Sequence, residues 1–365
     1  MTPRPGRMAP RRGAGPYTAT VRSRHIPTLR DVADQAGVHP GTVSRALNPA
    51  TRSMVNEATA RRVLVAAETL GYRPNSIARG LRTNRSSTVG VLVPDITNPF
   101  FPPILRGIED TLAEAGYTTL IANTDNEAER ERMGYEAFLG RHVDGLITAT
   151  AWLHDELLDE AFQARVPMVL MNRRLGRSGA SAVCTDDDLG IKLVVDHLVG
   201  LGHRSIAHLA GRMALSTAFA RHRAFTYAME AHDQAVDPGL IVICDRLTEE
   251  EGEKQTLALL DQGRPFTAVV AANDMLALGA YDALAKRGLS CPADLSVVGY
   301  NDVRFMDKLQ PPLTTVRVPK QDLGREAARM LLEQLAHEDA PPRLMLLQPE
   351  LVVRGSTGPP PSRPR

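Results

Sequence analysis

From Val89 onwards, short apolar runs alternate along the chain with amphipathic stretches of roughly 12 to 15 residues. This alternation is typical of parallel sheets in which a helix connects each strand to the next. About ten strands spread over roughly 265 residues fit two doubly wound lobes better than a single open sheet. The predicted strands are 89–95, 118–123, 145–150, 167–172, 181–186, 205–211, 240–245, 268–273, 296–301 and 313–318. The predicted helices are about 101–115, 127–140, 154–164, 188–201, 218–232, 249–262, 274–287 and 320–336.

Polar side chains stand at the ends of six of these predicted strands. In open α/β sheets, ligands bind beyond the carboxyl ends of the strands, so these side chains are expected to line a shared cleft. Turn formation is the alternative explanation, because Asn and Asp also suit loop conformations. As a set they offer donors and acceptors for a polyhydroxylated or heterocyclic small molecule. They are Asp95, Asn123, Asn172, Asp186, Asn273–Asp274 and Asn301–Asp302.

Residues 28–48 predict two short helices joined by a tight turn. Thr28 and Asp31 have the spacing of a capping box, and Gly37 permits the backbone reversal after the first helix. Pro40 suits the first turn of the second helix, whose outward face carries Arg45 and no acidic residue. This pattern is typical of a helix-turn-helix that lays its second helix in the major groove of DNA. The alternative is an ordinary helical hairpin within a core.

A third helix is predicted from a cap at Asn56 to about Leu70, with Gly71 as its end. Its apolar positions can close a small three-helix core with the preceding pair. The following segment, residues 72–83, is too short and too poor in helix formers to be stably helical alone. From the residues alone it is interpreted as a linker.

The formal net charge of +1 conceals a strong asymmetry along the chain. Residues 1–87 hold 15 Arg, no Lys and only four acidic residues, whereas the remainder holds 28 basic and 38 acidic side chains. A basic N-terminal part attracts phosphates, while the acidic remainder is repelled by them. Six of the Arg residues lie in residues 1–26, and without them the helical segment still carries +5. DNA binding is therefore supported independently of the helix pattern.

The motifs of several enzyme classes are missing from the sequence. No dinucleotide-binding fingerprint follows the first strand, and the sequence contains no P-loop, zinc-protease motif or nucleophile elbow. We therefore predict no catalytic residue, no cofactor and no metal site. Cys184, Cys244 and Cys291 are isolated and are expected to be buried, reduced thiols. With no apolar signal segment and no long apolar run, the sequence predicts a cytoplasmic protein.

Several strings along the chain occur in a characteristic order and spacing. They are residues 31–33 (DVA), 37–38 (GV), 42–48 (TVSRALN), 70–75 (LGYRPN), 98–101 (NPFF), 144–147 (DGLI), 197–204 (HLVGLGHR), 273–279 (NDMLALG) and 296–302 (SVVGYND). With these strings, the chain from Thr28 to about Thr357 resembles the lac repressor family of bacterial transcription regulators. The resemblance implies a helix-turn-helix head, a hinge helix, and a two-lobed core like the periplasmic binding proteins.

The resemblance also implies a division of the chain into head, hinge and core, while the composition of residues 1–26 and 356–365 predicts disordered tails. A disordered basic tail (1–26) precedes the DNA-binding head (27–74), the hinge helix with its linker (75–87), the core (88–355) and a disordered tail (356–365). Lobe 1 is expected to contain about 88–185 and 315–341, and lobe 2 about 186–314 and 342–355. The C-terminal tail lacks the Leu heptads that permit tetramers, so a homodimer is expected.

In the head, the resemblance places Pro40, Gly41 and Arg45 at base-reading positions, and Arg is the natural reader of guanine. His39 stands where the family usually has Ser as the helix cap. Leu81 matches a hinge leucine that inserts into the minor groove at the operator centre. The full set implied to contact DNA is Thr28, His39, Pro40, Gly41, Thr42, Ser44, Arg45, Asn48, Tyr72, Asn75, Ala78, Leu81 and Arg82.

In the core, the resemblance implies an effector cleft lined by Asp95, Phe100, Asn172, Arg221, Leu247, Asn273 and Asn301. Arg221 is the strongest of these, with a surface arginine beside an acidic neighbour as the alternative. Leu247 stands where many sugar-binding members have an aromatic residue, and Asn301 where Asp is frequent. A stacking face is then expected from Phe100, Trp152 or Tyr300.

The implied function is a dimeric transcription regulator, a repressor that binds a palindromic operator and responds to a sugar or related metabolite. Within this class, the alternative is a corepressor-dependent regulator that binds a nucleobase-like metabolite. From another class, the alternative is a soluble solute-binding protein or an enzyme with an incidental helical head.

Overall fold

The computed structural model describes residues 27–48, 51–73, 85–176, 179–337 and 339–361. The chain divides into two compact units, Met1–Arg79 and Gly80–Arg365, called the head and the core below. The predicted tail over 1–26 and most of the predicted hinge lie outside the described residues. The same holds for four of the residues implied to contact DNA, namely Asn75, Ala78, Leu81 and Arg82.

The described part of the head consists of α1 (Leu29–Ala36), α2 (Pro40–Leu47), η1 (Arg52–Met54) and α3 (Glu57–Leu70). The predicted start of α1 is confirmed, because Thr28 and Asp31 form a reciprocal capping box. Gly37 ends α1 and Gly71 ends α3, each in the left-handed conformation that costs glycine little (φ 64° and 65°). Asn56 caps α3, as its sequence position predicts.

The core of the head is made of small side chains. Val32, Val43 and Val63 are fully buried, one from each of the three α-helices. The predicted inward faces are therefore confirmed, and Leu47 and Leu70 pack at the edge of this cluster. Alanines surround the valines, which lets the helices approach one another closely. They are Ala33, Ala36, Ala46, Ala60, Ala66 and Ala67.

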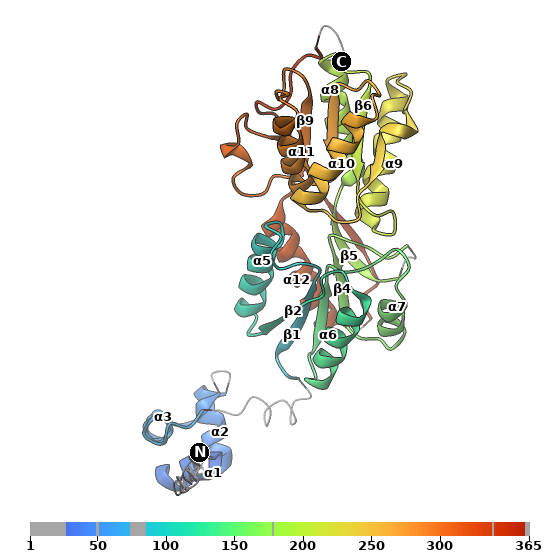
Figure 1. Cartoon of the computed structure of the whole chain (residues 1–365). Coiled ribbons are helices and arrows are strands. Elements are labelled where there is room, and N and C mark those ends of the chain that lie inside the picture. Colours follow the sequence, from blue (N-terminus) through green and yellow to red (C-terminus); the bar gives the residue numbers. More distant parts are fainter. Residues whose placement is uncertain (1–26, 49–50, 74–84, 177–178, 338, 362–365) are drawn as a thin grey trace, which may run out of the picture. The chain divides into compact units, whose positions relative to one another are not determined.

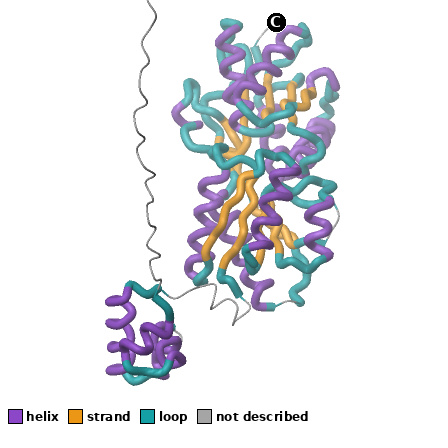
Figure 2. The backbone as a smooth tube through the Cα atoms, turned by 60° about the horizontal axis from the view of Figure 1, so that its bottom comes forward, coloured by secondary structure: helices purple, strands orange, loops and turns teal. Residues whose placement is uncertain are grey.

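Two sheets form the centres of the two lobes of the core, as the sequence predicts (Figures 1 and 2), and each sheet has six strands. The sheet of lobe 1 has the order β11-β5-β4-β3-β1-β2, and that of lobe 2 has the order β12-β10-β9-β8-β6-β7. Lobe 1 contains β1 (Thr88–Val93), β2 (Thr118–Asn123), β3 (Gly145–Thr148), β4 (Met168–Met171), β5 (Ser181–Thr185) and β11 (Leu344–Leu347). Lobe 2 contains β6 (Ile206–Ala210), β7 (Ile241–Ile243), β8 (Ala268–Ala271), β9 (Ser296–Asn301), β10 (Thr314–Arg317) and β12 (Glu350–Val352).

Helices cover both faces of the lobe 1 sheet because successive strand residues are apolar. Val91 of β1 packs in the cluster that includes residues of α5 (Phe101–Glu114) and α12 (Lys320–Ala336). Its neighbour Leu92 packs in a separate cluster with α6 (Ala128–Gly140) and α7 (Glu156–Gln163). Since adjacent strand residues point to opposite faces, each strand is buried from both sides.

The lobe 2 sheet is covered in the same manner. Helices α8 (Asp187–Gly200) and α9 (Ser216–Ala231) lie on one face, and α10 (Glu249–Asp261) and α11 (Asp274–Lys286) lie on the other (Figure 1). Short 3₁₀ turns, η2 (Pro238–Leu240) and η3 (Met306–Lys308), lie in the connections. The helices of both lobes begin and end within two residues of their predicted bounds.

The sequence predicts neither β11 nor β12, which are four and three residues long. Runs this short carry too little periodicity to be recognised. β12 pairs antiparallel with β10, so the expectation of purely parallel sheets is wrong for this edge strand.

The chain passes from one lobe to the other three times. Two of these three crossings lie at other residues than expected. β10 completes the sheet of lobe 2 beside β9, so the second crossing follows Arg317 instead of residue 314. β11 pairs with β5 in lobe 1, so the third crossing follows Leu347 instead of residue 341. Partner strands far away in sequence decide these positions.

Residues 356–361 lie against lobe 2, although their composition predicts disorder. Ser356 is fully buried, and its carbonyl accepts a hydrogen bond from the Val297 N–H (2.9 Å). The Gly358 carbonyl is 2.9 Å from Nε2 of His203. The segment is fixed because its backbone groups bond to lobe 2.

The close contact between α5 and α12 depends on two glycines. A Cβ at Gly107 would lie 2.2 Å from the Gln321 carbonyl oxygen, and one at Gly324 would lie 2.0 Å from that of Ile104. Both distances are far below van der Waals contact, so any side chain would force the helices apart.

Within the described ranges, no helix is long and apolar enough to cross a membrane. The same residues contain no cluster of three or more His, Cys, Asp or Glu placed to hold a metal ion. Cys184 and Cys244 are buried free thiols, as expected, and burial raises the pKa of each to about 12. Cys291 is only half-buried, because it lies in the turn before β9 and not in a strand.

Candidate DNA-binding surface and inter-lobe cavity

Helix α2 and its two caps, His39 and Asn48, carry seven of the nine described residues that are implied to contact DNA. Val43 and Ala46 hold the helix on the core of the head, and this orientation leaves Arg45 exposed. The other implied residues on and beside this helix are partly or fully accessible: His39, Pro40, Gly41, Thr42, Ser44 and Asn48. The helix therefore presents a small polar surface with one long cationic side chain at its centre.

His39 performs the capping role at the start of α2. Its Nδ1 accepts a hydrogen bond from the Gly41 N–H (3.1 Å). Because Nδ1 is the acceptor, the neutral ring carries its proton on Nε2, which remains a donor. A Cβ at Gly41 would lie 3.2 Å from the same Nδ1, so the glycine gives the imidazole its room.

Replacing His39 with Ala should loosen the start of α2. Loss of an N-cap costs about 0.5–2 kcal/mol, which corresponds to roughly 2- to 30-fold faster amide exchange. His39→Ser keeps an acceptor and should exchange like the parent protein. Hydrogen exchange of α2 in the full chain, read by mass spectrometry, compares the three proteins. Equal exchange in the Ala variant and the parent would show that the imidazole does not stabilise the helix.

Two further implied DNA contacts have structural roles within the head. The Thr28 hydroxyl donates to Oδ2 of Asp31 (2.8 Å), so its proton is committed to the capping box. Tyr72 is half-buried and packs against the apolar core of the head, and its N–H donates to the Ala67 carbonyl (2.8 Å). Any DNA contact from these residues must use the atoms that these roles leave accessible.

A cavity of about 600 Å³ opens between the two lobes of the core. All seven residues implied to bind an effector line it, three from lobe 1 and four from lobe 2: Asp95, Phe100, Asn172, Arg221, Leu247, Asn273 and Asn301. Ten further polar residues line the wall without being predicted from the sequence, namely Asn98, Asp125, Asn126, Glu127, Arg173, Arg212, Thr217, Asp245, Arg246 and Thr248. Of these, Arg173 could have been found, because it directly follows Asn172 at the end of a predicted strand.

Residues of lobe 2 hold the Arg221 side chain in place. Its Nε–H donates to Oδ1 of Asp187 (2.8 Å), and its Nη1–H donates to the Ala272 carbonyl (2.6 Å). Its guanidinium carbon lies 3.7 Å from the centre of the Tyr300 ring, whose hydroxyl donates to the same Asp187 oxygen (2.9 Å). Arg221 is only 6% exposed, so the alternative of a surface arginine is excluded.

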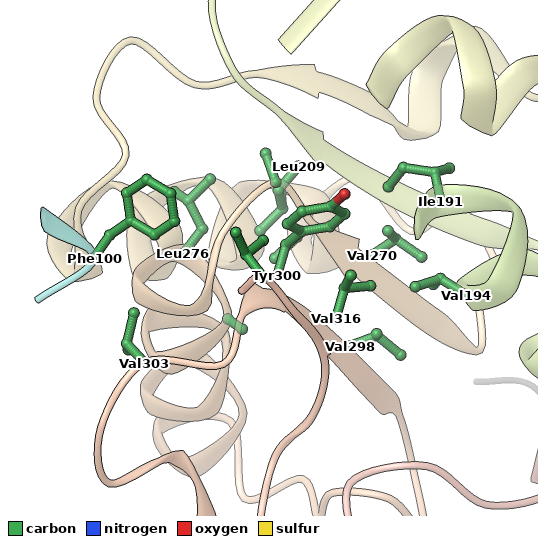
Figure 3. Packing of buried hydrophobic residues seen from close by; sticks show 14 of the residues in the cluster. Phe100, Ile191, Val194, Leu209, Val270, Leu276, Val298, Tyr300, Val303 and Val316 are labelled. Atoms are coloured by element: carbon green, nitrogen blue, oxygen red, sulfur yellow. The ribbon is translucent and has the colours of Figure 1, made fainter. Parts of the chain in front are cut away.

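Tyr300 cannot supply the expected stacking face. It is fully buried among apolar side chains such as Leu209 and Val316 (Figure 3), and it does not line the cavity. Burial, and then the nearby Asp187 carboxylate, raise the pKa of Tyr300 well above its ordinary value. The hydroxyl therefore stays protonated and donates to Asp187. Phe100 and Trp152 both line the cavity and remain candidates for stacking.

Asn301 combines a strained backbone with an unpartnered side-chain atom. Its φ of 114° is rare for any residue but glycine. The ammonium of Lys320 secures this turn by donating to the carbonyls of Asn301 (2.5 Å) and Asp302 (2.8 Å). Asn301 is 7% exposed, and its buried Oδ1 has no hydrogen-bond donor among the described residues. An acceptor left this way at a cavity wall is suited to a donor on a ligand.

The Asn273 side chain already makes two hydrogen bonds within the protein. Its side-chain oxygen accepts from the Leu276 N–H (2.9 Å), which caps α11, and its amide donates to the Leu247 carbonyl (3.0 Å). Asn273 therefore connects the predicted wall residue Leu247 to α11. A ligand can use only the remaining hydrogen of the amide and the remaining lone pair.

The polar strand ends that do not line the cavity bond to other groups within the fold. Asp186 caps α8 by accepting from the Leu189 N–H (3.0 Å), and Asn123 accepts from the Ile96 N–H (2.7 Å). Asp274 is buried and accepts from the Thr315 hydroxyl and the Val303 N–H. Burial raises its pKa to about 7. Loop conformations also occur at the cavity wall, because Asn172 and Asn301 have positive φ values (64° and 114°). Cavity lining and turn chemistry therefore apply together at these two residues.

Comparison with known proteins identifies both parts of the chain. Residues 28–75 match the description "Bacterial regulatory proteins, lacI family", and residues 195–357 match "Periplasmic binding protein-like domain". The chain is similar to the ribose operon repressor of Halalkalibacterium halodurans, with 34% identity over 330 residues that cover 90% of this chain and 97% of the relative.

Two solved structures resemble the chain over nearly its whole length. One is the lac repressor dimer bound to operator and the anti-inducer ONPF, with a TM-score of 0.81, 28% identity, and coverage of 91% of this chain and 99% of that chain. The other is the complex of the transcriptional regulator CelR with cellobiose, with a TM-score of 0.69, 33% identity, and coverage of 90% and 99%.

Proposed function

The chain belongs to the lacI family of bacterial regulatory proteins, and from that premise we propose how its own residues bind DNA and an effector. It is a DNA-binding transcriptional repressor controlled by a small molecule. We assign base reading to α2, with Arg45 as its principal side chain, and effector binding to the inter-lobe cavity. We further propose that it acts as a homodimer on a palindromic operator, which the similarity to an operator-bound repressor dimer supports.

The unpartnered Oδ1 of Asn301 is the observation that carries the effector assignment. A buried acceptor without a donor costs about 1–3 kcal/mol, and a hydroxyl or amine of a ligand would remove this cost. Phe100 and the half-buried Trp152 both line the cavity and give its wall aromatic surface. A ring with several hydroxyl groups satisfies both requirements, so we assign the effector to sugars or closely related metabolites.

The effector acts by connecting the two lobes. Asp95 and Asn172 approach it from lobe 1, and Arg221 and Asn301 approach it from lobe 2. A ligand that contacts both walls stabilises the lobe arrangement in which both walls reach it. Operator affinity then changes by the difference in ligand affinity between the two arrangements, typically 1–3 kcal/mol.

Selection of DNA from a random duplex pool tests the operator assignment. We expect a palindromic consensus whose affinity falls steeply with salt, because the head neutralises phosphates. Addition of the effector should change the affinity for this consensus and not the affinity for random DNA. Enrichment without two-fold symmetry would contradict a dimer on a palindrome. An affinity independent of salt would contradict binding through the basic head.

Replacing Asn301 with Gly should separate stability from function. Glycine adopts a φ of 114° without strain, so we expect the thermal midpoint to rise by roughly 2–4 °C for each kcal/mol of strain relieved. The same change removes the free acceptor, so more effector should be needed to alter operator binding. Calorimetry and an effector titration of the DNA complex measure the two effects. An unchanged midpoint together with an unchanged response would contradict both roles of Asn301.

A further inference from the structure

Arg173 is a buried cation whose direct partners are both neutral. It lies just beyond β4, lines the lobe 1 wall of the cavity and is only 6% exposed. Its Nη1–H donates to the Thr150 carbonyl (3.2 Å), and its Nη2–H donates to Oδ1 of Asn126 (2.9 Å). Within the described ranges, no carboxylate oxygen lies within 4.0 Å of its guanidinium nitrogens, whereas Arg221 has Asp187 at 2.8 Å. The two buried arginines of the cavity wall, Arg173 and Arg221, thus differ in how the protein compensates their charge.

The acidic group that acts most on Arg173 compensates it only partly. Glu131 is buried behind the cavity wall and accepts a hydrogen bond from the Thr150 hydroxyl. Burial raises the pKa of Glu131 to about 7, which disfavours the negatively charged form of this carboxyl near neutral pH. Burial likewise lowers the pKa of Arg173, to about 10, so its guanidinium remains charged.

The carboxylates that line the cavity bond to groups other than Arg173. Asp95 accepts from the Thr97 hydroxyl (2.6 Å). Asp125 and Glu127 both pair with Arg130, at 2.5 and 2.9 Å. Asp245 lies 3.9 Å from Arg212. The Arg173 guanidinium is therefore a buried charge without a paired ion among the described residues. Such a charge is costly until a counter-ion binds to it.

We propose that the effector carries an anionic group, a carboxylate or a phosphate, and that Arg173 binds it. This rests on the proposed effector cavity and assigns the ligand class within it. Guanidinium groups pair with carboxylates and phosphates through parallel N–H donors, and such bonds are roughly twice as strong as neutral ones. On the opposite wall, Asn301 is a neutral side chain and adds no negative charge facing the ligand.

Matched ligand pairs test this assignment by calorimetric titration of the full chain. The probes are D-glucose against D-gluconate and glucose 6-phosphate, and D-ribose against ribose 5-phosphate. We expect an anionic member to bind at least tenfold more tightly than its neutral partner, and the gluconate and phosphate arms distinguish the two anions. Arg173→Met should weaken the anion roughly 10- to 150-fold, and Arg173→Lys should retain part of the preference. Tighter binding of the neutral sugars, unaffected by Arg173→Met, would overturn the anionic ligand and leave the effector cavity in place.

A second measurement is independent of which ligand is chosen. In the ligand-free protein, Arg173→Met removes an uncompensated buried charge and should leave the thermal midpoint unchanged or raise it. The matched variant Arg221→Met leaves the buried Asp187 carboxylate without its cation and should lower the thermal midpoint by several degrees. If Arg173→Met lowers the midpoint as much as Arg221→Met, the protein itself compensates Arg173 and the proposal is wrong. Failure of all probes to bind to a protein that still binds its operator would count against the cavity assignment as well.

Discussion

The Arg221→Met variant should lose its response to the effector and about 3–5 kcal/mol of stability. Arg221 and Asp187 form a pair at 2.8 Å with side chains only 7% and 8% exposed. Removal of the cation leaves a buried carboxylate whose remaining side-chain donor among the described residues is the uncharged Tyr300 hydroxyl. The effector would lose a fixed donor at the same time. Urea unfolding and an effector titration of the operator complex measure the two losses.

Two companion variants separate the loss of stability from the loss of response. In Arg221→Met combined with Asp187→Asn, the amide oxygen can still accept from Tyr300 and no buried charge is stranded. Most of the stability should return while the effector response stays absent. Arg223→Met is the matched control on the same helix, because Arg223 pairs with Asp188 where the side chains are 38% and 57% exposed. Its effect on stability should stay below about 1 kcal/mol. A normal effector response in the double variant would remove Arg221 from the effector site.

The same variant reports the sign of regulation in cells. If the effector releases the repressor from DNA, Arg221→Met with Asp187→Asn will repress even when effector is present. If the effector is a corepressor, the double variant will fail to repress. A single reporter gene under the operator distinguishes the two outcomes, since the phenotypes are opposite.

Arg45→Ala should cost roughly 1–3 kcal/mol of discrimination between the operator and random DNA. Arg45 is the exposed arginine of α2, and the other implied contacts on this helix are short or lack a side chain. Binding to random DNA should change little, because it depends on the total positive charge of the head. Competition titrations of operator against random duplex, at two salt concentrations, measure this difference.

Arg30→Ala serves as the control, because Arg30 is an exposed arginine on α1 and the substitution removes the same charge. It should affect operator and random DNA alike. Equal losses on both DNAs for Arg45→Ala would make Arg45 a phosphate contact and refute its base-reading role. The insertion of Leu81 into the minor groove stays a prediction, since Leu81 lies outside the described residues.

The local features of this fold could be predicted because the signals that produce them act within a few residues. Thr28 and Asp31 form their capping box across three residues, and Gly37 ends α1 within its own turn. The alternation of strands and helices follows from apolar periodicity, so ten strands and their connecting helices lie close to where they are expected. β11 and β12 were beyond prediction because each is short and is stabilised by a partner strand more than 30 residues away.

In the candidate site, too, some features follow from the local sequence and others depend on the tertiary structure. The sequence indicated part of the cavity wall, because strand ends such as Asn172 and Asn301 meet at the carboxyl edge of a parallel sheet. It did not indicate the wall residues that loops supply, such as Asn126 and Arg212. The tertiary structure alone decided their electrostatic state. Arg221 lies 34 residues from the carboxylate that neutralises it, whereas Arg173 is bonded to neutral oxygens at Thr150 and Asn126. Compensation of a buried charge depends on distances of a few ångströms between distant segments, and those distances exist only once the sheets have assembled.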